Sequence, residues 1–156
     1  MDRPQRDDLL MRTARIWSER STCSRAHVGC VISRDGRILV QGYNGAPAGI
    51  DHCDHTCNCS IGQSSPKHDT NCPAGQYCTI SVHAEANAIA FAARHGVALQ
   101  DTELHTTRIP CTTCAMLIIN AGIGRVIYRE NHRDMGGLTL FRQVLMRVAK
   151  DDKVSP

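Results

Sequence analysis

The chain has 156 residues, a length that fits one domain built around a single hydrophobic core. Hydrophobic residues make up 42% and charged residues 21%, values that exclude a fibrous or wholly disordered chain. The formal charge is only +3 and aromatic residues make up 4%, so we expect neither a surface for duplex nucleic acid nor a stacking platform for single strands.

Cysteine is the unusual residue, with nine in the chain. No apolar run is long enough to span a bilayer, so no membrane partner is expected, and the first twelve residues lack the apolar stretch of a secretory signal. These features predict a cytoplasmic protein. Thiols stay reduced in that compartment, and nine cysteines there favour metal binding or catalysis over disulfides.

The N-terminal third reads as a helix followed by a hairpin. Apolar residues recur at helical spacing over 7–20, which predicts an amphipathic helix with Trp17 in the core. Two β-rich runs at 28–33 and 37–43 flank Asp35-Gly36, a dipeptide typical of hairpin turns.

A polar segment over 51–78 holds five cysteines, and a structureless segment of this length implies that something other than a hydrophobic core, such as a metal, fixes it. Regular elements resume beyond it. The sequence predicts a helix from His83 that ends at Gly96, a strand over 102–107, a helix over 111–121 closed by Gly122, a strand over 125–128 and a last helix over 137–148. This order predicts an α/β fold, a three-layer α/β/α sandwich around a mixed sheet of four or five strands, with one domain over 1–156.

Two short motifs carry the chemistry: His83-Ala84-Glu85 and Pro110-Cys111-Thr112-Thr113-Cys114. Residues three apart share a helix face, so Cys111 and Cys114 can place both sulfurs on one ion, and a helix start favours thiolates. His83 would be the third ligand. Zinc with three protein ligands keeps one position open, which is typical of a catalytic site.

Glu85 is predicted to be a proton carrier, because a carboxylate beside a zinc-activated water has no need to be a ligand. HxE followed by PCxxC is the signature of zinc-dependent nucleobase deaminases. The alternative is a structural zinc knuckle in which Glu85 is only a first-turn helix charge.

The segment 21–128 resembles the deoxycytidylate (dCMP) deaminases of the cytidine deaminase superfamily, in particular the bacterial and phage type. The motifs that carry the resemblance are Ser21-Thr22-Cys23, Val28-Gly29, Gly42-Tyr43-Asn44-Gly45 with Pro47 and Gly49, His52-Cys53, the HAEANA segment from His83, and PCTTC. The resemblance implies a cytidine deaminase-like fold and zinc-dependent hydrolysis of dCMP to dUMP, with Glu85 moving protons.

The resemblance also implies roles for residues around the substrate. The amides of Ala84 and Cys111 would hold the base carbonyl and the attacking group, and Asn44 would contact the sugar. Arg25 is expected near the phosphate, with His27 as a second candidate. His132 stands where relatives often place an aromatic ring over the base or phosphate.

Regulation and assembly are further expectations from the resemblance. Such enzymes are often homo-oligomers, commonly hexamers, that dCTP activates and dTTP inhibits. Phe91 and Arg94 fall in a segment that the family associates with this regulation; simple helix packing and a surface ion pair are the alternative.

A second, structural zinc is implied by the resemblance, with ligands at Cys23, Cys53, Cys78 and a further thiol, Cys57 or Cys59. Cys72 and His68 stay open as replacements. Cys30, within an apolar strand, is expected to be a small buried hydrophobic residue.

Three other functions compete with dCMP deamination. The same zinc chemistry acts on modified cytosine nucleotides and on bases in tRNA or single-stranded DNA. A zinc-stabilised binding module without catalysis is the third, and it predicts that Glu85 is dispensable.

Overall fold

A computed structural model describes residues 3–23, 26–50, 52 and 81–152. Apart from His52, the predicted cysteine-rich segment lies outside these residues. The elements in chain order are α1 (Arg6–Ser18), β1 (Gly29–Arg34), β2 (Arg37–Tyr43), α2 (Ala84–Arg94), β3 (Glu103–Arg108), α3 (Thr112–Asn120), β4 (Arg125–Glu130), α4 (Gly136–Gln143) and β5 (Arg147–Lys150).

The five strands form one mixed sheet in the order β2-β1-β3-β4-β5. Strand β1 is antiparallel to both β2 and β3, whereas β3, β4 and β5 run parallel to one another. Strands β2, β3 and β4 therefore point the same way, and their carboxyl ends meet at one edge of the sheet. Loops that follow these three strands converge at that edge.

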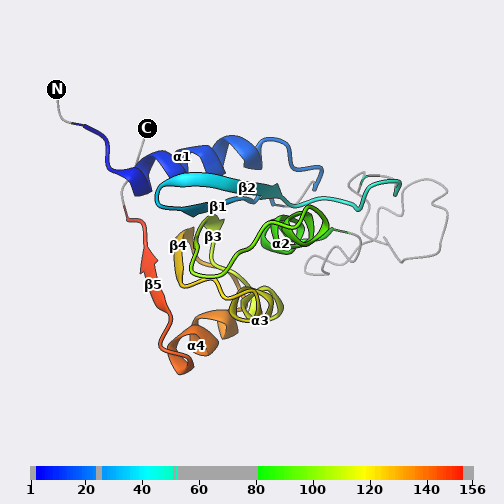
Figure 1. The fold of residues 1–156 in the computed structure, drawn as a ribbon. Helices are drawn as coiled ribbons and strands as arrows, with labels where there is room; N and C mark the ends of the chain where they lie inside the picture. The colour runs from blue at the N-terminus through cyan, green and yellow to red at the C-terminus, as the bar shows by residue number, and fades with distance from the viewer. Residues whose placement is uncertain (1–2, 24–25, 51, 53–80, 153–156) are drawn as a thin grey trace.

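Helices cover both faces of the sheet, which confirms the predicted three-layer architecture (Figure 1). Helix α1 packs on one face through Leu10 and Ala14, which contact Val31 of β1. Helices α2, α3 and α4 share the larger core on the other face, where Cys30 and Ile32 of the same strand point. The side chains of β1 thus alternate between two cores, and Cys30 is fully buried, as the sequence predicts.

The predicted turn and helix ends are confirmed. Asp35 and Gly36 adopt φ values of 54° and 77°, the left-handed conformation that a tight hairpin of this twist needs. Gly96 and Gly122 follow the ends of α2 and α3 with φ values of 66° and 75°, a conformation that costs glycine little.

The C-terminal prediction was wrong in one respect. The helix predicted over 137–148 ends at Gln143, and Arg147–Lys150 forms the fifth strand instead. Leu145, which lies within the range of the predicted helix, has a φ of 55° and is 90% exposed. A left-handed residue cannot continue a helix, so the chain turns there and pairs with β4.

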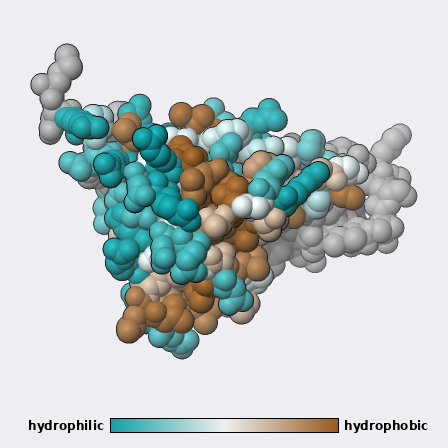
Figure 2. All heavy atoms as spheres, in the orientation of Figure 1, coloured by the Kyte–Doolittle hydropathy of each residue, from teal (hydrophilic) through white to brown (hydrophobic). Residues whose placement is uncertain are grey.

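The surface is largely hydrophilic around the chain ends, whereas apolar side chains gather over α4 and the turn that follows it in the chain (Figure 2). Val144 and Leu145 belong to that apolar area. Among the helices of the described residues, none combines the length and apolar character needed to cross a membrane.

Candidate active site

The two predicted motifs lie where two helices begin. His83 is the N-cap residue of α2 and Cys111 is the N-cap residue of α3, both with extended backbone angles. His83 follows the bridge between Gly45 and Val82 at the end of β2, and Cys111 follows β3. Both helix starts therefore stand at the edge where the carboxyl ends of β2, β3 and β4 meet.

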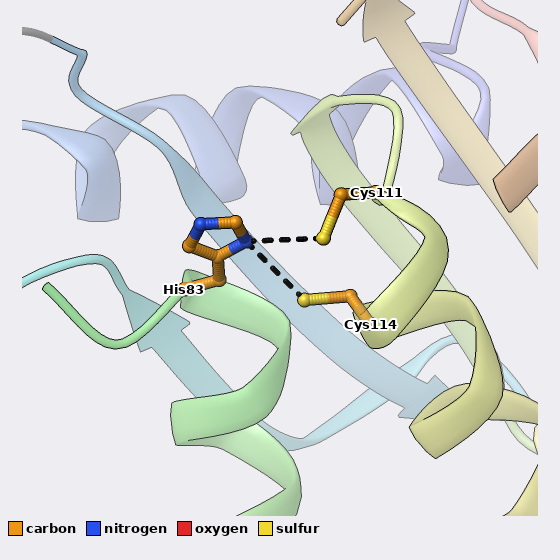
Figure 3. Close-up of side chains that lie close together, drawn as sticks. All are labelled: His83, Cys111 and Cys114. Atoms are coloured by element: carbon orange, nitrogen blue, oxygen red, sulfur yellow. Dashed lines mark hydrogen bonds between the residues drawn. The ribbon is translucent and has the colours of Figure 1, made fainter. Parts of the chain in front are cut away.

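Three potential metal ligands come together at this edge (Figure 3). The Nδ1 atom of His83 lies 3.4 Å from Sγ of Cys111 and 3.4 Å from Sγ of Cys114. Zinc bound tetrahedrally at about 2.0 Å from nitrogen and about 2.3 Å from sulfur separates those atoms by about 3.5 Å. The donor set and its spacing therefore fit zinc, and His83 contributes Nδ1.

The two sulfurs are electrostatically unequal. A hydrogen bond from Cys114, supported by His83, lowers the pKa of Cys111 to about 4 against the cost of burial. The same bond to Cys111, together with burial and the Glu85 carboxylate, raises the pKa of Cys114. The hydrogen bond with Cys111 outweighs burial and raises the pKa of His83. Cys111 is thus the thiolate of the pair, and a divalent cation favours deprotonation of both.

Glu85 is buried one helix position beyond Ala84, on the first turn of α2. Its Oε1 atom accepts a hydrogen bond from Oγ1 of Thr106 on β3, at 3.1 Å. Burial is the main cause that raises the pKa of this carboxyl. This carboxyl lies beside the donor group and binds a proton more readily than an exposed one. Both properties suit general acid and base catalysis.

A second cluster of possible ligands among the described residues has a different character. Asp7, Glu103 and His105 bring one ligand atom each within 4.8 Å. Arg125 already binds both carboxylates, with its closest contact to Asp7 at 2.7 Å. This cluster is therefore an ion-pair network that joins α1 to the sheet.

Comparisons with known proteins agree with the geometry. The family model for the cytidine and deoxycytidylate deaminase zinc-binding region matches residues 4–130. The deoxycytidylate deaminase of Mycobacterium phage D29 is 38% identical over 128 residues, which cover 82% of this chain and 97% of that protein. The chain belongs to this deaminase family.

Two further relatives set the extent of the likeness. A crystal structure of the dCMP deaminase from cyanophage S-TIM5, in complex with dCMP and dUMP, matches with a TM-score of 0.77 and 30% identity, over 97% of this chain and 100% of that one. The deoxycytidylate deaminase of Saccharomyces cerevisiae is 35% identical over 133 residues, 84% of this chain. The chain spans 39% of the length of that yeast protein.

Membership in the zinc-binding deaminase family confirms zinc as the metal and a zinc-dependent deaminase as the class of enzyme. His83 is exposed at the mouth of the site, whereas Cys114 and Glu85 are buried behind it. The donor group is therefore open to solvent on the side of His83, while Glu85 lies in the protein interior.

The side chain of Asn44, the predicted sugar contact, also has a structural role. Its Oδ1 accepts the amide hydrogen of Val28 at 2.7 Å, and its Nδ2 donates to the carbonyl of Ala26 at 2.7 Å. Asn44 therefore anchors the segment that carries His27, an exposed residue. Within the described residues, one amide hydrogen and one lone pair of the Asn44 side chain have no partner.

The other predicted residues fall into three places. His132 follows β4 and its ring centroid lies 6.5 Å from that of His83, so it borders the site. The ring centroid of Phe91 lies 4.2 Å from that of His95, with the rings tilted by 38°, near the far end of α2. Arg94 is exposed there, and the two residues lie about 12–16 Å along the helix from His83. Cys23 is described and buried, whereas the remaining predicted residues lie outside the described part of the chain: Arg25, Cys53, Cys57, Cys59, His68, Cys72 and Cys78.

Sequence reasoning missed two residues of the site. The contact of Thr106 with Glu85 was not predicted, because the sequence does not distinguish a strand threonine that binds a carboxylate from one that does not. Asp134 stands two residues before Gly136, whose amide it binds as a local cap would, and it also binds Thr112, 22 residues earlier. Both contacts are tertiary and have no local sequence signal.

Proposed function

We propose that this protein catalyses the hydrolytic deamination of dCMP to dUMP with release of ammonia. The observation that carries the proposal is the His83, Cys111 and Cys114 donor group with buried Glu85 beside it. Its substrate follows from the likeness, over nearly the whole chain, to phage enzymes named for dCMP.

His83, Cys111 and Cys114 would hold the zinc ion. When bound, zinc supplies Lewis acidity that lowers the pKa of water in its fourth coordination position. The buried start of α2 behind the donor group would keep the reacting centre away from bulk solvent. Electrostatic interactions are stronger in the protein interior than in water.

Glu85 moves the protons of the reaction. It accepts a proton from water as the water oxygen attacks C4 of the cytosine ring, and it delivers that proton to N3. In the second half it carries the proton of the new C4 hydroxyl to the amino group, the C4–N bond breaks as the C4 carbonyl forms, and ammonia leaves. Thr106 would hold the carboxyl in place through its hydrogen bond to Oε1.

The substrate contacts extend the proposal. The amides of Ala84 and Cys111, both at helix starts, are donors for the base carbonyl and the attacking oxygen. Asn44 would use its remaining hydrogen-bonding capacity on the sugar. His27, between the two residues that Asn44 binds, and Arg25 are the candidates for the phosphate.

A second zinc belongs to the proposal as well. Cys23, Cys53, Cys57 and Cys78 would form a closed structural site, with Cys59, Cys72 or His68 as replacements for Cys57. Metal analysis of the purified protein is expected to give close to two zinc ions per chain, and Cys53→Ser to lose one. A content of one zinc in the unaltered protein would refute the second site.

The proposal also includes regulation and assembly. The protein would form a homo-oligomer, such as a hexamer, that dCTP and dTTP regulate through Phe91 and Arg94. Rate curves against dCMP should be sigmoidal and become hyperbolic with dCTP. Curves that are hyperbolic at every nucleotide concentration would refute the regulatory part and leave the catalytic part intact.

The deciding experiment measures ammonia release from dCMP, dCTP, deoxycytidine, 5-hydroxymethyl-dCMP and a single-stranded oligonucleotide. We expect the highest kcat/KM with dCMP. Glu85→Gln is the matched control, because it keeps the shape of the side chain and the zinc ligands but should lower kcat by about 10²–10⁴-fold. Turnover of only the modified nucleotide or the oligonucleotide would overturn the choice of dCMP, and unchanged turnover in Glu85→Gln would overturn the mechanism.

A further inference from the structure

The start of helix α3 is capped by a residue from another part of the chain. Its N-cap residue is Cys111, whose sulfur faces His83 and makes no cap hydrogen bond within the described residues. Asp134, from the loop after β4, supplies the cap instead. Its Oδ2 accepts the amide hydrogen of Thr112 at 2.8 Å, and its Oδ1 accepts the hydroxyl hydrogen of Thr112 at 2.9 Å.

The same carboxylate binds the start of helix α4. Oδ1 of Asp134 accepts the amide hydrogen of Gly136 at 2.8 Å. A Cβ atom on Gly136 would collide with the Thr112 hydroxyl, and one on Gly137 with the carbonyl of Pro110. The two glycines therefore let the starts of α3 and α4 approach closely, with one carboxylate between them.

Asp134 is held as an anion. The amide hydrogens of Thr112 and Gly136 lower the pKa of its carboxyl, and the positive ends of two helix dipoles add to the effect. The loop that carries Asp134 is thus fastened to the helix that carries Cys111 and Cys114.

The backbone of Asp134 fixes His132. The amide hydrogen of Asp134 is donated to Nδ1 of His132 at 2.9 Å. Because Nδ1 accepts, it carries no hydrogen, and the proton of the neutral ring is on Nε2. The ring is half-buried and tilted by 58° to that of His83, at 6.5 Å between centroids.

We propose that Asp134 is a positioning residue that presents Nε2–H of His132 as a hydrogen-bond donor to the phosphate of the nucleotide substrate. The inference rests on the proposed function, since it assumes a nucleotide. A base that reaches the donor group at His83 brings its sugar and phosphate within reach of a ring this close. Nε2 is the ring nitrogen that Asp134 leaves free, and a phosphate is an acceptor that an N–H donor binds.

The first test is spectroscopic and needs no activity. Long-range proton–nitrogen correlation spectra of the zinc-loaded protein, assigned with the His132→Phe variant, should show the Nε2–H tautomer for His132. An Nδ1–H tautomer would overturn the inference, because it cannot accept the Asp134 amide hydrogen.

The second test is a double-mutant cycle with His132→Phe and Asp134→Asn. The phenylalanine ring keeps the shape but loses the donor, and asparagine keeps one acceptor oxygen while losing the charge. Each variant should raise KM for dCMP roughly tenfold or more with kcat and zinc content close to those of the unaltered protein. The double variant should be no worse than His132→Phe alone, because Asp134 acts through His132.

Deoxycytidine, which has no phosphate, is the matched substrate: its kcat/KM should not change in His132→Phe. An equal loss with deoxycytidine, additive effects in the double variant, or zinc loss in Asp134→Asn would each overturn the inference while leaving the proposed function standing. Absence of dCMP turnover in the unaltered protein would instead refute the proposed function, and the inference with it.

Discussion

The hydroxyl of Thr106 lies 3.1 Å from Oε1 of Glu85, and both side chains are buried. The same hydroxyl lies 3.0 Å from the carbonyl oxygen of Arg108. One hydroxyl hydrogen serves one acceptor at a time, so Thr106 donates to Glu85 when the carboxylate is ionised. When Glu85 carries a proton it becomes the donor, and Thr106 turns to Arg108.

Thr106→Val should lower kcat roughly tenfold to a hundredfold, because a buried hydrogen bond to a charged group contributes about 1.5–3 kcal/mol. The change keeps the volume and branching of the side chain. Thr106→Ser, which retains the hydroxyl, should restore most of the activity. Steady-state kinetics with zinc content measured in each preparation checks this, and equal losses in both variants would assign Thr106 a packing role only.

Replacing Cys114 by serine should remove one zinc ion per chain and abolish turnover. A serine hydroxyl is not ionised at neutral pH as a zinc-bound thiol is, so the donor group would be left with two strong ligands. Cys30→Ala is the matched control, since Cys30 is buried in the core and is not one of the three donors. It should keep the full zinc content, as measured by elemental analysis; loss of zinc in the control would contradict the ligand assignment.

The contribution of His105 to the stability of the protein should fall as the pH drops below about 6.5. Burial is the main cause that lowers the pKa of His105, although its hydrogen bond to Asp7 opposes the shift. The unfolded chain, in which this histidine has an ordinary pKa of about 6.5, then binds a proton that the folded protein does not. The free energy of unfolding therefore decreases with falling pH.

His105→Gln should show a smaller fall in Tm between pH 7.5 and pH 5.5 than the unaltered protein. The Tm difference between the two proteins at pH 7.5 gives the cost of repacking, which is present at both pH values. Thermal unfolding followed by circular dichroism checks this, and parallel pH curves would show that His105 does not contribute to the pH dependence.

Gly42→Ala should disturb the active site through the backbone. A Cβ atom there would collide with the carbonyl oxygen of Ala84 and lie 3.0 Å from Cβ of Ala88. Overpacking of this kind costs about 1–3 kcal/mol and shifts the start of α2, which carries His83 and Glu85. Gly124→Ala is the matched control because its nearest neighbours would be at 3.9 Å. Activity and Tm should fall in the first variant only.

Local signals were sufficient for much of this fold. Asp35-Gly36 and Gly96 marked their turns correctly because each depends on the backbone of a few neighbouring residues. The last strand was not located, and part of it was assigned to a helix, because Leu145 and Val148 fall at helical spacing. Nothing local reveals that Leu145 turns outward or that Val148 pairs with Val126 of β4.

The metal donors were equally accessible from sequence, because Cys111 and Cys114 share one helical turn and His83 opens the neighbouring helix. The supporting contacts were not. Thr106 reaches Glu85 only because β3 packs beside α2, and Asp134 reaches Thr112 only because β4 is parallel to β3. Such contacts depend on topology rather than on spacing.

Strand β3 places two consecutive residues in unrelated environments: His105 meets Asp7 of α1 on one face, and Thr106 meets Glu85 of α2 on the other. Deleting one residue between Thr106 and Pro110 would shift the strand by one position, and would put the His105 imidazole against Glu85 and the Leu104 side chain against the Asp7 carboxylate. Changes in chain length should therefore be tolerated at the Asp35-Gly36 turn but not in the few residues before Cys111. A scan of single-residue deletions would show a boundary at this strand.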